Sequence, residues 1–280
     1  GSALAAPVVG AFAVYLPDSD VGGHAEAFAE AALGPLARAT MVTPYFFGPI
    51  FAFISDNPSQ ELTGMWGSVG GYFAFGAVVL AGLALTVRRD RAARVLLAAV
   101  AAIFLSRMYG VPGFAKLVNL VPGIPLTAFY RYGAPAVSFV VVTLAALAID
   151  DLTGGRVRRR AVLAAGPVAL VVLALLIRPA LEPLRQLPDL TGKRAWAGAS
   201  VALAVGAVAV VVVAGLVRPP GLRRGLLVAL VVVEATVLFL VPQGSARRNV
   251  ELDTAVMNFL RHELDTEAFV GFGTIQPNYG

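Results

Sequence analysis

The 280-residue chain has no cysteine and only two histidines, His24 and His262. Without cysteine it can form no disulfide framework and has no thiol nucleophile, and two isolated histidines exclude an HExxH or Cys/His zinc pattern. Charged residues are also scarce, at 14% against the ~25% of soluble domains, while 58% of the residues are hydrophobic. These shortages exclude a water-soluble globule as the class of protein.

Motifs of soluble nucleotide chemistry are missing as well. The sequence contains no GxxxxGK[ST] loop, no GxSxG elbow and no dinucleotide-binding fingerprint, and the glycines of GGYFAFG lie inside an apolar stretch. The net charge of +5 could suggest a nucleic-acid partner, but the basic residues lie at the ends of apolar stretches rather than in one patch. We therefore expect no nucleic-acid partner, and no cofactor is evident.

What the chain does have is a series of long apolar stretches, each near the ~20 residues that cross a hydrocarbon core. Backbone amides in lipid must be paired inside a helix, so strand-forming valines do not argue for strands here. The sequence predicts an all-α polytopic membrane protein with about seven transmembrane helices. The predicted spans are residues 1–16, 67–87, 92–108, 132–149, 161–177, 195–217 and 225–242.

Arginine density predicts the orientation of these spans. The connections at residues 88–94, 150–160 and 218–224 are short and rich in arginine, and the positive-inside rule assigns them to the cytoplasm. The longer connections and the C-terminus would then be extracytoplasmic. Pro167 lies inside its predicted span and is expected to kink it.

The domain organisation follows from the same pattern. Residues 1–242 are predicted to form the transmembrane domain, with an outer loop at residues 17–66. In this loop, residues 24–37 are predicted to form an interfacial helix, and TPYFFGPIFAF is expected to join an aromatic belt or to pack over the helix bundle. Residues 243–280 read as an amphipathic helix and a short strand, which predicts the start of an extracytoplasmic α/β module that continues beyond this segment.

Polar residues between the third and fourth predicted spans form the first candidate site. Guanidinium and ammonium groups bind phosphate oxygens, and tyrosine rings can hold a polyprenyl chain or a sugar face. The alternative is ordinary snorkelling and an aromatic belt at the ends of spans. The candidate cations are Arg107, Lys116 and Arg131, and the candidate rings are Tyr109, Tyr130 and Tyr132.

Three acidic residues are further candidates. Glu234 lies near the middle of the last predicted span, where an ionised carboxylate costs at least ~2.5 kcal/mol, so it must face protein or water. It could contact a proton, ion or substrate, or it could simply fix helix packing. Asp18 and Asp20 could supply a general base or a metal ligand, although paired acids in a loop are more often turn and capping residues. The pattern predicts no resident metal and leaves open whether a divalent cation takes part.

Four segments in order resemble the bacterial YfhO-like family of multi-spanning membrane proteins, within the GT-C glycosyltransferase class. They are TPYFFGPIF, GGYFAFGAVVLAGLAL, VPGIPLTAFYRYGAPAVSFVVVTLAALAIDDL, and VVVEATVLFLVPQ with VMNFLRHEL and FVGFGTIQPNYG after it. The third is the most specific and closes on the acidic pair Asp150 and Asp151.

The resemblance implies an enzyme that moves a sugar from a polyprenyl-phosphate carrier, itself a membrane lipid, to an extracytoplasmic cell-envelope acceptor. In GT-C enzymes the acidic catalytic residue lies in the first outer loop, and we expect this chain to be an internal fragment that begins after it. No catalytic residue is therefore carried over, and Arg107, Lys116 and Arg131 stay as candidates for the carrier phosphate. The alternatives are a polytopic transporter or lipid flippase that uses Glu234, and a non-catalytic envelope scaffold.

Overall fold

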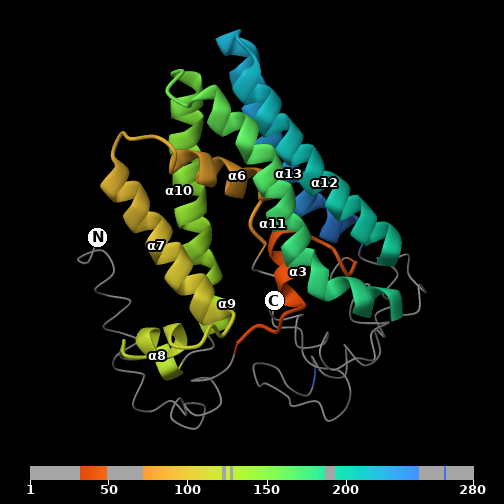
Figure 1. The fold of residues 1–280 in the computed structure, drawn as a ribbon. Coiled ribbons are helices and arrows are strands. Elements are labelled where there is room, and N and C mark those ends of the chain that lie inside the picture. Colours follow the sequence, from red (N-terminus) through yellow and green to blue (C-terminus); the bar gives the residue numbers. More distant parts are fainter. Residues whose placement is uncertain are drawn as a thin grey trace. The chain divides into compact units, whose positions relative to one another are not determined.

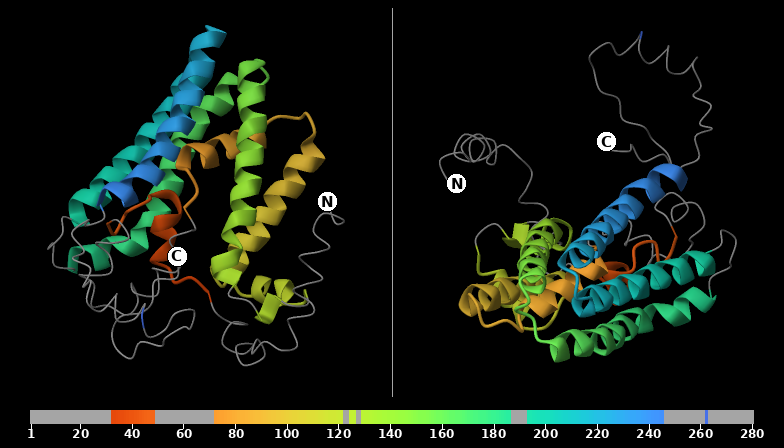
Figure 2. Two further views of the ribbon diagram at one scale, coloured as in Figure 1. Left: turned by 180° about the vertical axis from the view of Figure 1, so that it is seen from behind. Right: turned by 90° about the horizontal axis from the view of Figure 1, so that it is seen from above.

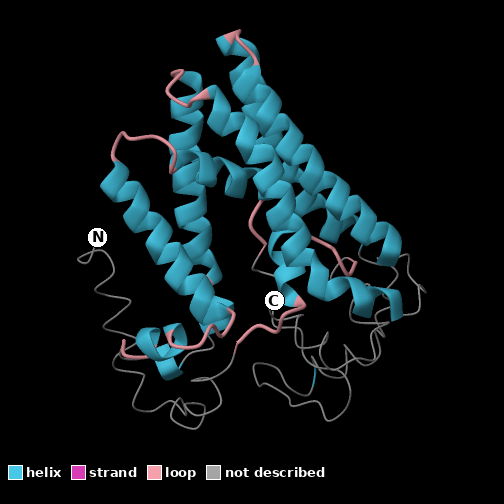
Figure 3. Ribbon diagram, in the orientation of Figure 1, coloured by secondary structure: helices cyan, strands magenta, loops and turns pink. Residues whose placement is uncertain are grey.

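A computed structural model describes residues 32–48, 72–121, 124–126, 129–186, 193–245 and 262. The chain divides into two units, Gly1–Ser245 and Ala246–Gly280. Every regular element of the described residues is a helix (Figure 3), which confirms the all-α class for this part of the chain. The strand of the predicted α/β module at residues 243–280 lies outside the described residues. The helices in chain order are α3 (Ala37–Val42), α6 (Phe75–Ala84), α7 (Arg91–Met108), α8 (Phe114–Val118), η4 (Ile124–Leu126), α9 (Phe129–Tyr132), α10 (Ala134–Thr153), α11 (Arg159–Gln186), α12 (Lys193–Leu216) and α13 (Pro220–Ser245).

Three of these helices are long and apolar enough to cross a membrane. They are Ala134–Thr153, Arg159–Gln186 and Arg194–Leu216, at the places of the predicted spans 132–149, 161–177 and 195–217. Helix α11 continues well beyond its predicted end although it contains Pro167, Pro179 and Pro183.

The prediction of about seven such helices is wrong for the described residues. Helix α6 occupies the predicted span 67–87 with only ten residues. The predicted spans 92–108 and 225–242 are helical, as α7 and α13, but neither helix is among the three. Helix α7 contains Arg91, Arg94 and Arg107, and α13 contains Arg223, Arg224 and Glu234. Residues 1–16 lie outside the described part of the chain.

The turns that join α6 to α7, α10 to α11 and α12 to α13 lie at one end of the helices, and α8 and α9 lie at the other (Figure 1). We call the first of these the arginine-rich end, because it holds the arginine-rich connections named above. A salt bridge of 3.5 Å from Arg89 Nη1 to Asp150 Oδ2 joins the first two turns directly.

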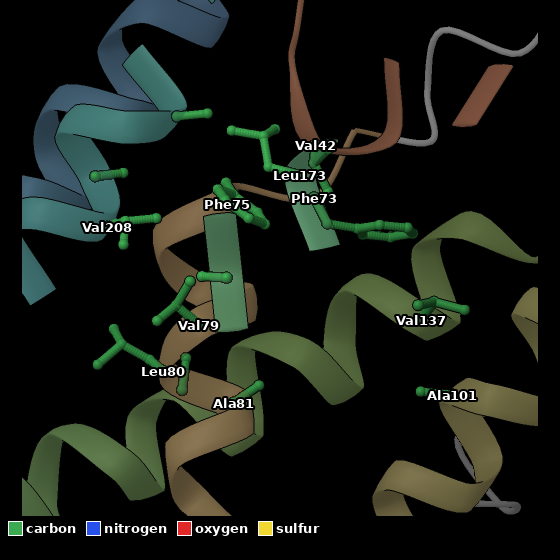
Figure 4. Packing of buried hydrophobic residues seen from close by; sticks show 14 of the residues in the cluster. Val42, Phe73, Phe75, Val79, Leu80, Ala81, Ala101, Val137, Leu173 and Val208 are labelled. Atoms are coloured by element: carbon green, nitrogen blue, oxygen red, sulfur yellow. The ribbon is translucent and has the colours of Figure 1, made fainter. Parts of the chain in front are cut away.

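Helix α6 lies at the centre of the packing, against α10 and α12. Its Phe75, Leu80 and Leu83 are almost completely buried, and Figure 4 shows Phe75, Val79 and Leu80 grouped with Leu173 of α11 and Val208 of α12. Around this centre α11 and α12 run side by side, and α7 packs on α10 (Figure 2). The core therefore forms around a helix that is shorter than its neighbours.

The aromatic segment after α3 packs into the bundle, so its described part, residues 43–48, is not an aromatic belt. Phe46 and Phe47 are buried, and the hydroxyl of Tyr45 donates a hydrogen bond of 2.7 Å to the carbonyl oxygen of Leu238 in α13. Ser200 Oγ of α12 donates to the carbonyl oxygen of Pro44 at 2.8 Å. Burial raises the pKa of Tyr45 to about 12, so its hydroxyl remains a neutral donor at physiological pH.

The predicted interfacial helix at residues 24–37 is not helical at residues 32–36, and only its last residue, Ala37, lies in a helix. Residues 32–34 are irregular, residues 35–36 form a turn, and α3 starts only at Ala37. Gly34 and Pro35 stand at this point, and proline disfavours a helical conformation in the residue before it. The remainder of the predicted helix lies outside the described residues.

Candidate functional site

Arg107, the first predicted phosphate ligand, points into the protein. It lies in the last turn of α7 and its side chain is fully buried. Its Nε donates a hydrogen bond of 3.0 Å to Asn119 Oδ1, and its guanidinium carbon lies 5.8 Å from the centre of the Phe129 ring. An arginine stacked on an aromatic ring and bonded to an amide holds α7, the end of α8 and α9 together. Arg107 thus positions this end of the molecule.

Lys116 has the opposite orientation, because it is exposed on α8. The two candidate cations Arg107 and Lys116 therefore do not converge on one point. Arg131 lies in α9, and its side chain is outside the described part of the structure. Of the cations predicted for the phosphate, Lys116 is the one whose described side chain reaches the surface.

The predicted tyrosines flank the same region. Tyr109, directly after α7, is half-buried and donates a hydrogen bond of 3.2 Å to the carbonyl oxygen of Ala37. Burial raises its pKa to about 12. Tyr130 of α9 is also half-buried, and the side chain of Tyr132 is outside the described part. The hydrogen bond from Tyr109 therefore connects the end of α7 to the start of α3.

Sequence reasoning missed the apolar surface around Lys116. Phe114, Leu117, Leu120 and Val121 are 40%, 53%, 76% and 53% exposed, whereas Val118 is buried. Apolar side chains exposed to this degree around one cation are typical of a segment that lies in a membrane interface. The Pro-Gly pairs in VPG and NLVPG around α8 could have indicated that this connection folds back on the helix ends.

Glu234, the predicted intramembrane acid, is 4% exposed and faces protein. Its Oε1 accepts a hydrogen bond of 3.0 Å from the backbone N–H of Gly76 in the first turn of α6. Helix dipoles favour a negative charge at this end, and the first amides of a helix have no partner inside it. This contact gives Glu234 a definite packing role.

The acidic candidates Asp18 and Asp20 lie outside the described residues. Within the part of the chain that the structure describes, no group of three or more His, Asp or Glu side chains could hold a metal ion.

A network of buried charge at the arginine-rich end was not predicted as a site. Asp151, near the end of α10, is fully buried and accepts hydrogen bonds from Arg94 Nη1 of α7 at 2.5 Å and from Arg156 Nε at 2.7 Å. Arg156 also pairs with the exposed Asp150. The hydrogen bond to Asp151 raises the pKa of Arg156 above its usual value. The signal in the sequence was an arginine one turn inside a predicted apolar span together with an acidic pair at the end of another.

Arg94 and Arg223 also cap helices other than their own. Arg94 Nη1 donates to the carbonyl oxygen of Ala84, the last residue of α6, at 2.8 Å. Arg223 of α13 donates to the carbonyl oxygens of Val217 at 2.7 Å and Ala214 at 3.2 Å, and also to that of Leu152. The last carbonyls of a helix lack partners inside it, so these guanidinium groups fix the ends of α6, α10 and α12. The described contacts of Arg94, Arg223 and Asp151 at this end therefore stabilise the packing of the helix ends.

The described residues thus define an all-helical fold with three helices long and apolar enough to cross a membrane. Comparison of the chain with protein-family models, with curated proteins and with solved structures gives no match.

Proposed function

We propose that this chain is the membrane-embedded part of a GT-C-type glycosyltransferase in a bacterial plasma membrane. It would take a sugar from a polyprenyl-phosphate carrier and deliver it to an extracytoplasmic cell-envelope acceptor. The sequence resemblance supplies the reaction, and one structural observation supports the site: α8 presents the exposed apolar side chains of Phe114 and Leu117 on both sides of the exposed Lys116.

A polyprenyl phosphate combines an apolar chain with an anionic head, and the surface of α8 offers a partner for each. Phe114, Leu117 and Leu120 would contact the chain, and Lys116 would contact the phosphate. Arg107 would act as a positioning residue, because its hydrogen bond to Asn119 fixes the residue that follows α8. Lys116 would thus bind the phosphate and Arg107 would position the segment. The sequence had instead suggested that several cations surround one phosphate.

We further propose that α7 and α13 cross the membrane with the three most apolar helices. The high cost of a charge in the membrane applies to a side chain that faces lipid. Arg94 is paired with Asp151, and Glu234 with the amide of Gly76, so both helices direct these charges into the protein. By the positive-inside rule the arginine-rich end would face the cytoplasm, and α8 would lie in the outer interface, where the acceptor is.

The test uses full-length protein in lipid vesicles and a synthetic polyprenyl phosphate with a photoreactive group next to the phosphate. Lys116→Glu should reduce cross-linking to the peptide containing α8 by roughly tenfold, because it replaces attraction with repulsion. Lys116→Arg should retain cross-linking, and Arg224→Glu at the other end is the matched charge reversal. Equal labelling of Lys116→Glu and native protein would remove this site from the proposal.

Sugar transfer is measured separately with a polyprenyl-phosphate sugar. Binding without any transfer would favour the lipid flippase, and neither binding nor transfer would favour the scaffold.

A further inference from the structure

A groove of about 370 Å³ lies between α6 and α11. It follows α6 from Phe75 to Thr86 and α11 from Ala161 to Val172, and its lining is almost entirely apolar. Its polar lining residue, Thr86, lies at the arginine-rich end and donates its hydroxyl to the carbonyl oxygen of Leu83 at 2.7 Å. The groove is therefore apolar, and the hydroxyl of its polar lining residue is already hydrogen-bonded.

Small residues create this space. Gly82 of α6 faces Ala161, Ala164 and Ala165 of α11 across the groove, and a Cβ added at Gly82 would meet no atom within 4 Å. Helix α11 is also the least covered of the three apolar helices: 17% of its apolar window is buried, against 44% for α10 and 33% for α12. The groove therefore lies along the helix with the most surface available to lipid.

Cations stand at the mouth of the groove. Arg158, directly before α11, precedes the lining residue Ala161 by three positions, and Arg160 precedes the lining residue Ala164 by four. Each arginine is thus one turn before a lining residue, and the two flank the mouth of the groove from different sides. Both are exposed, and within the described residues neither guanidinium group makes a hydrogen bond or salt bridge. Arg156, only a few residues earlier, is occupied by Asp150 and Asp151.

The start of α11 adds to this positive potential. Its first turn contains no acidic side chain, and the first amides of a helix attract anions. On the α6 side of the mouth Arg88 follows Thr86 by two residues and is also exposed. The arrangement is apolar along its length and cationic at one end.

We propose that this groove binds an acyl chain of an anionic glycerophospholipid from the leaflet at the arginine-rich end, with the lipid phosphate held by Arg158 and Arg160. The lining residues of α11 from Ala161 to Val172 span about 17 Å, close to half of a ~30 Å hydrocarbon core and thus to the depth of one leaflet. Basic pockets between membrane helices also bind anionic headgroups. The site is at the opposite end from the proposed carrier site and does not depend on the proposed function.

The experiment uses full-length protein in phosphatidylcholine nanodiscs that contain a small fraction of phosphatidylglycerol with a diazirine in its acyl chain. After illumination, the labelled positions are mapped by mass spectrometry. We expect labels on the groove residues of α6 and α11, and roughly tenfold less labelling there when Arg158 and Arg160 are both replaced by Ala.

Two further variants separate the parts of the proposal. The double variant Arg159→Ala with Arg224→Ala removes the same charge from the same end. The residues three and four positions after Arg159, Val162 and Leu163, do not line the groove, so labelling should persist. Gly82→Leu fills the groove and should abolish labelling while Arg158 and Arg160 remain. Gly82→Ala, which leaves most of the space open, is its control for folding.

Each contrary result overturns the proposal. Equal loss in both arginine double variants would mean general attraction of anionic lipid to this end. Unchanged labelling in Gly82→Leu would mean that the chain lies elsewhere. Equal labelling by diazirine phosphatidylcholine would mean that the headgroup is not recognised.

Discussion

The carboxylate of Glu234 in α13 caps the first turn of α6 by accepting the backbone N–H of Gly76 at 3.0 Å. The residue at the N-cap position of α6 is Ala74, which has no side chain that could accept this hydrogen bond. Such a cap is normally supplied by a residue next to the helix in the sequence. Here it comes from Glu234 of α13, which lies 158 residues further along the chain than Gly76. Because Glu234 is buried, the contact ties the position of α6 to that of α13.

Gly76→Ala tests how close this approach is. A Cβ at residue 76 would lie 2.7 Å from Glu234 Oε2 and 2.9 Å from Leu230 Cδ2, so α6 and α13 would have to separate. We expect a loss of about 1–3 kcal/mol, measured as a lower unfolding temperature in detergent. Gly82→Ala in the same helix meets no atom and should be neutral or stabilising by up to about 1 kcal/mol. If both variants unfold at the same temperature, the close contact is wrong.

Substitution of Glu234 distinguishes a role of its carboxylate in helix packing from a role in binding an ion or proton. Glu234→Gln retains an oxygen that can accept from Gly76 and should unfold near the native temperature. Glu234→Leu leaves a buried amide without its partner and should cost about 1–3 kcal/mol. Vesicle uptake assays on Glu234→Gln complete the test: lost uptake in a stable Gln variant would show that the carboxylate has a transport role in addition to its cap.

The pair formed by Arg94 and Asp151 should behave as a buried ion pair. Asp151→Leu leaves Arg94 buried with the carbonyl of Ala84 alone and should cost about 3–5 kcal/mol. Arg94→Met should cost less, because Arg156 still neutralises Asp151. The double variant should recover part of the loss, since two apolar side chains leave no unpaired charge.

Arg89→Ala is the control for this pair. It removes a half-exposed arginine from Asp150 and should cost at most about 1 kcal/mol. Simple additivity of Arg94→Met and Asp151→Leu would contradict the direct coupling.

Arg223 and its neighbour Arg224 provide a matched test of helix capping. Arg223 reaches carbonyls at the ends of α10 and α12, whereas Arg224 is exposed. We expect Arg223→Ala to cost roughly 1–3 kcal/mol and Arg224→Ala to have no measurable effect. Arg223→Lys should resemble the Ala variant, because an ammonium group cannot fork to several carbonyls as a guanidinium can. The readout is again the unfolding temperature, and equal sensitivity of the two positions would exclude capping as the cause.

The helical class and the three long apolar spans could be predicted because each depends only on the composition of one continuous stretch. The start of α6 could not be predicted in this way, because it is fixed by Glu234, which lies far away in the sequence. The number of spans was overestimated for a related reason. A count of apolar residues cannot tell a helix that crosses lipid from one that ends inside the bundle.

The candidate site shows the same limit. Arg107 had the correct residue type for a phosphate, but its direction depends on where α8 places Asn119. The pairing of Arg94 with Asp151 requires that the start of α7 lies beside the end of α10. Both facts depend on packing between segments, whereas sequence patterns describe segments one at a time.

The small size of α6 has a consequence for synthesis of the protein. Ten residues of helix rise about 15 Å, half of a ~30 Å hydrocarbon core, so α6 does not have the length of such a core and depends on its neighbours for burial. The helices that surround it, α10 and α12, emerge from the ribosome later. The contacts that bury the central helix can therefore be completed only after α12 has been translated.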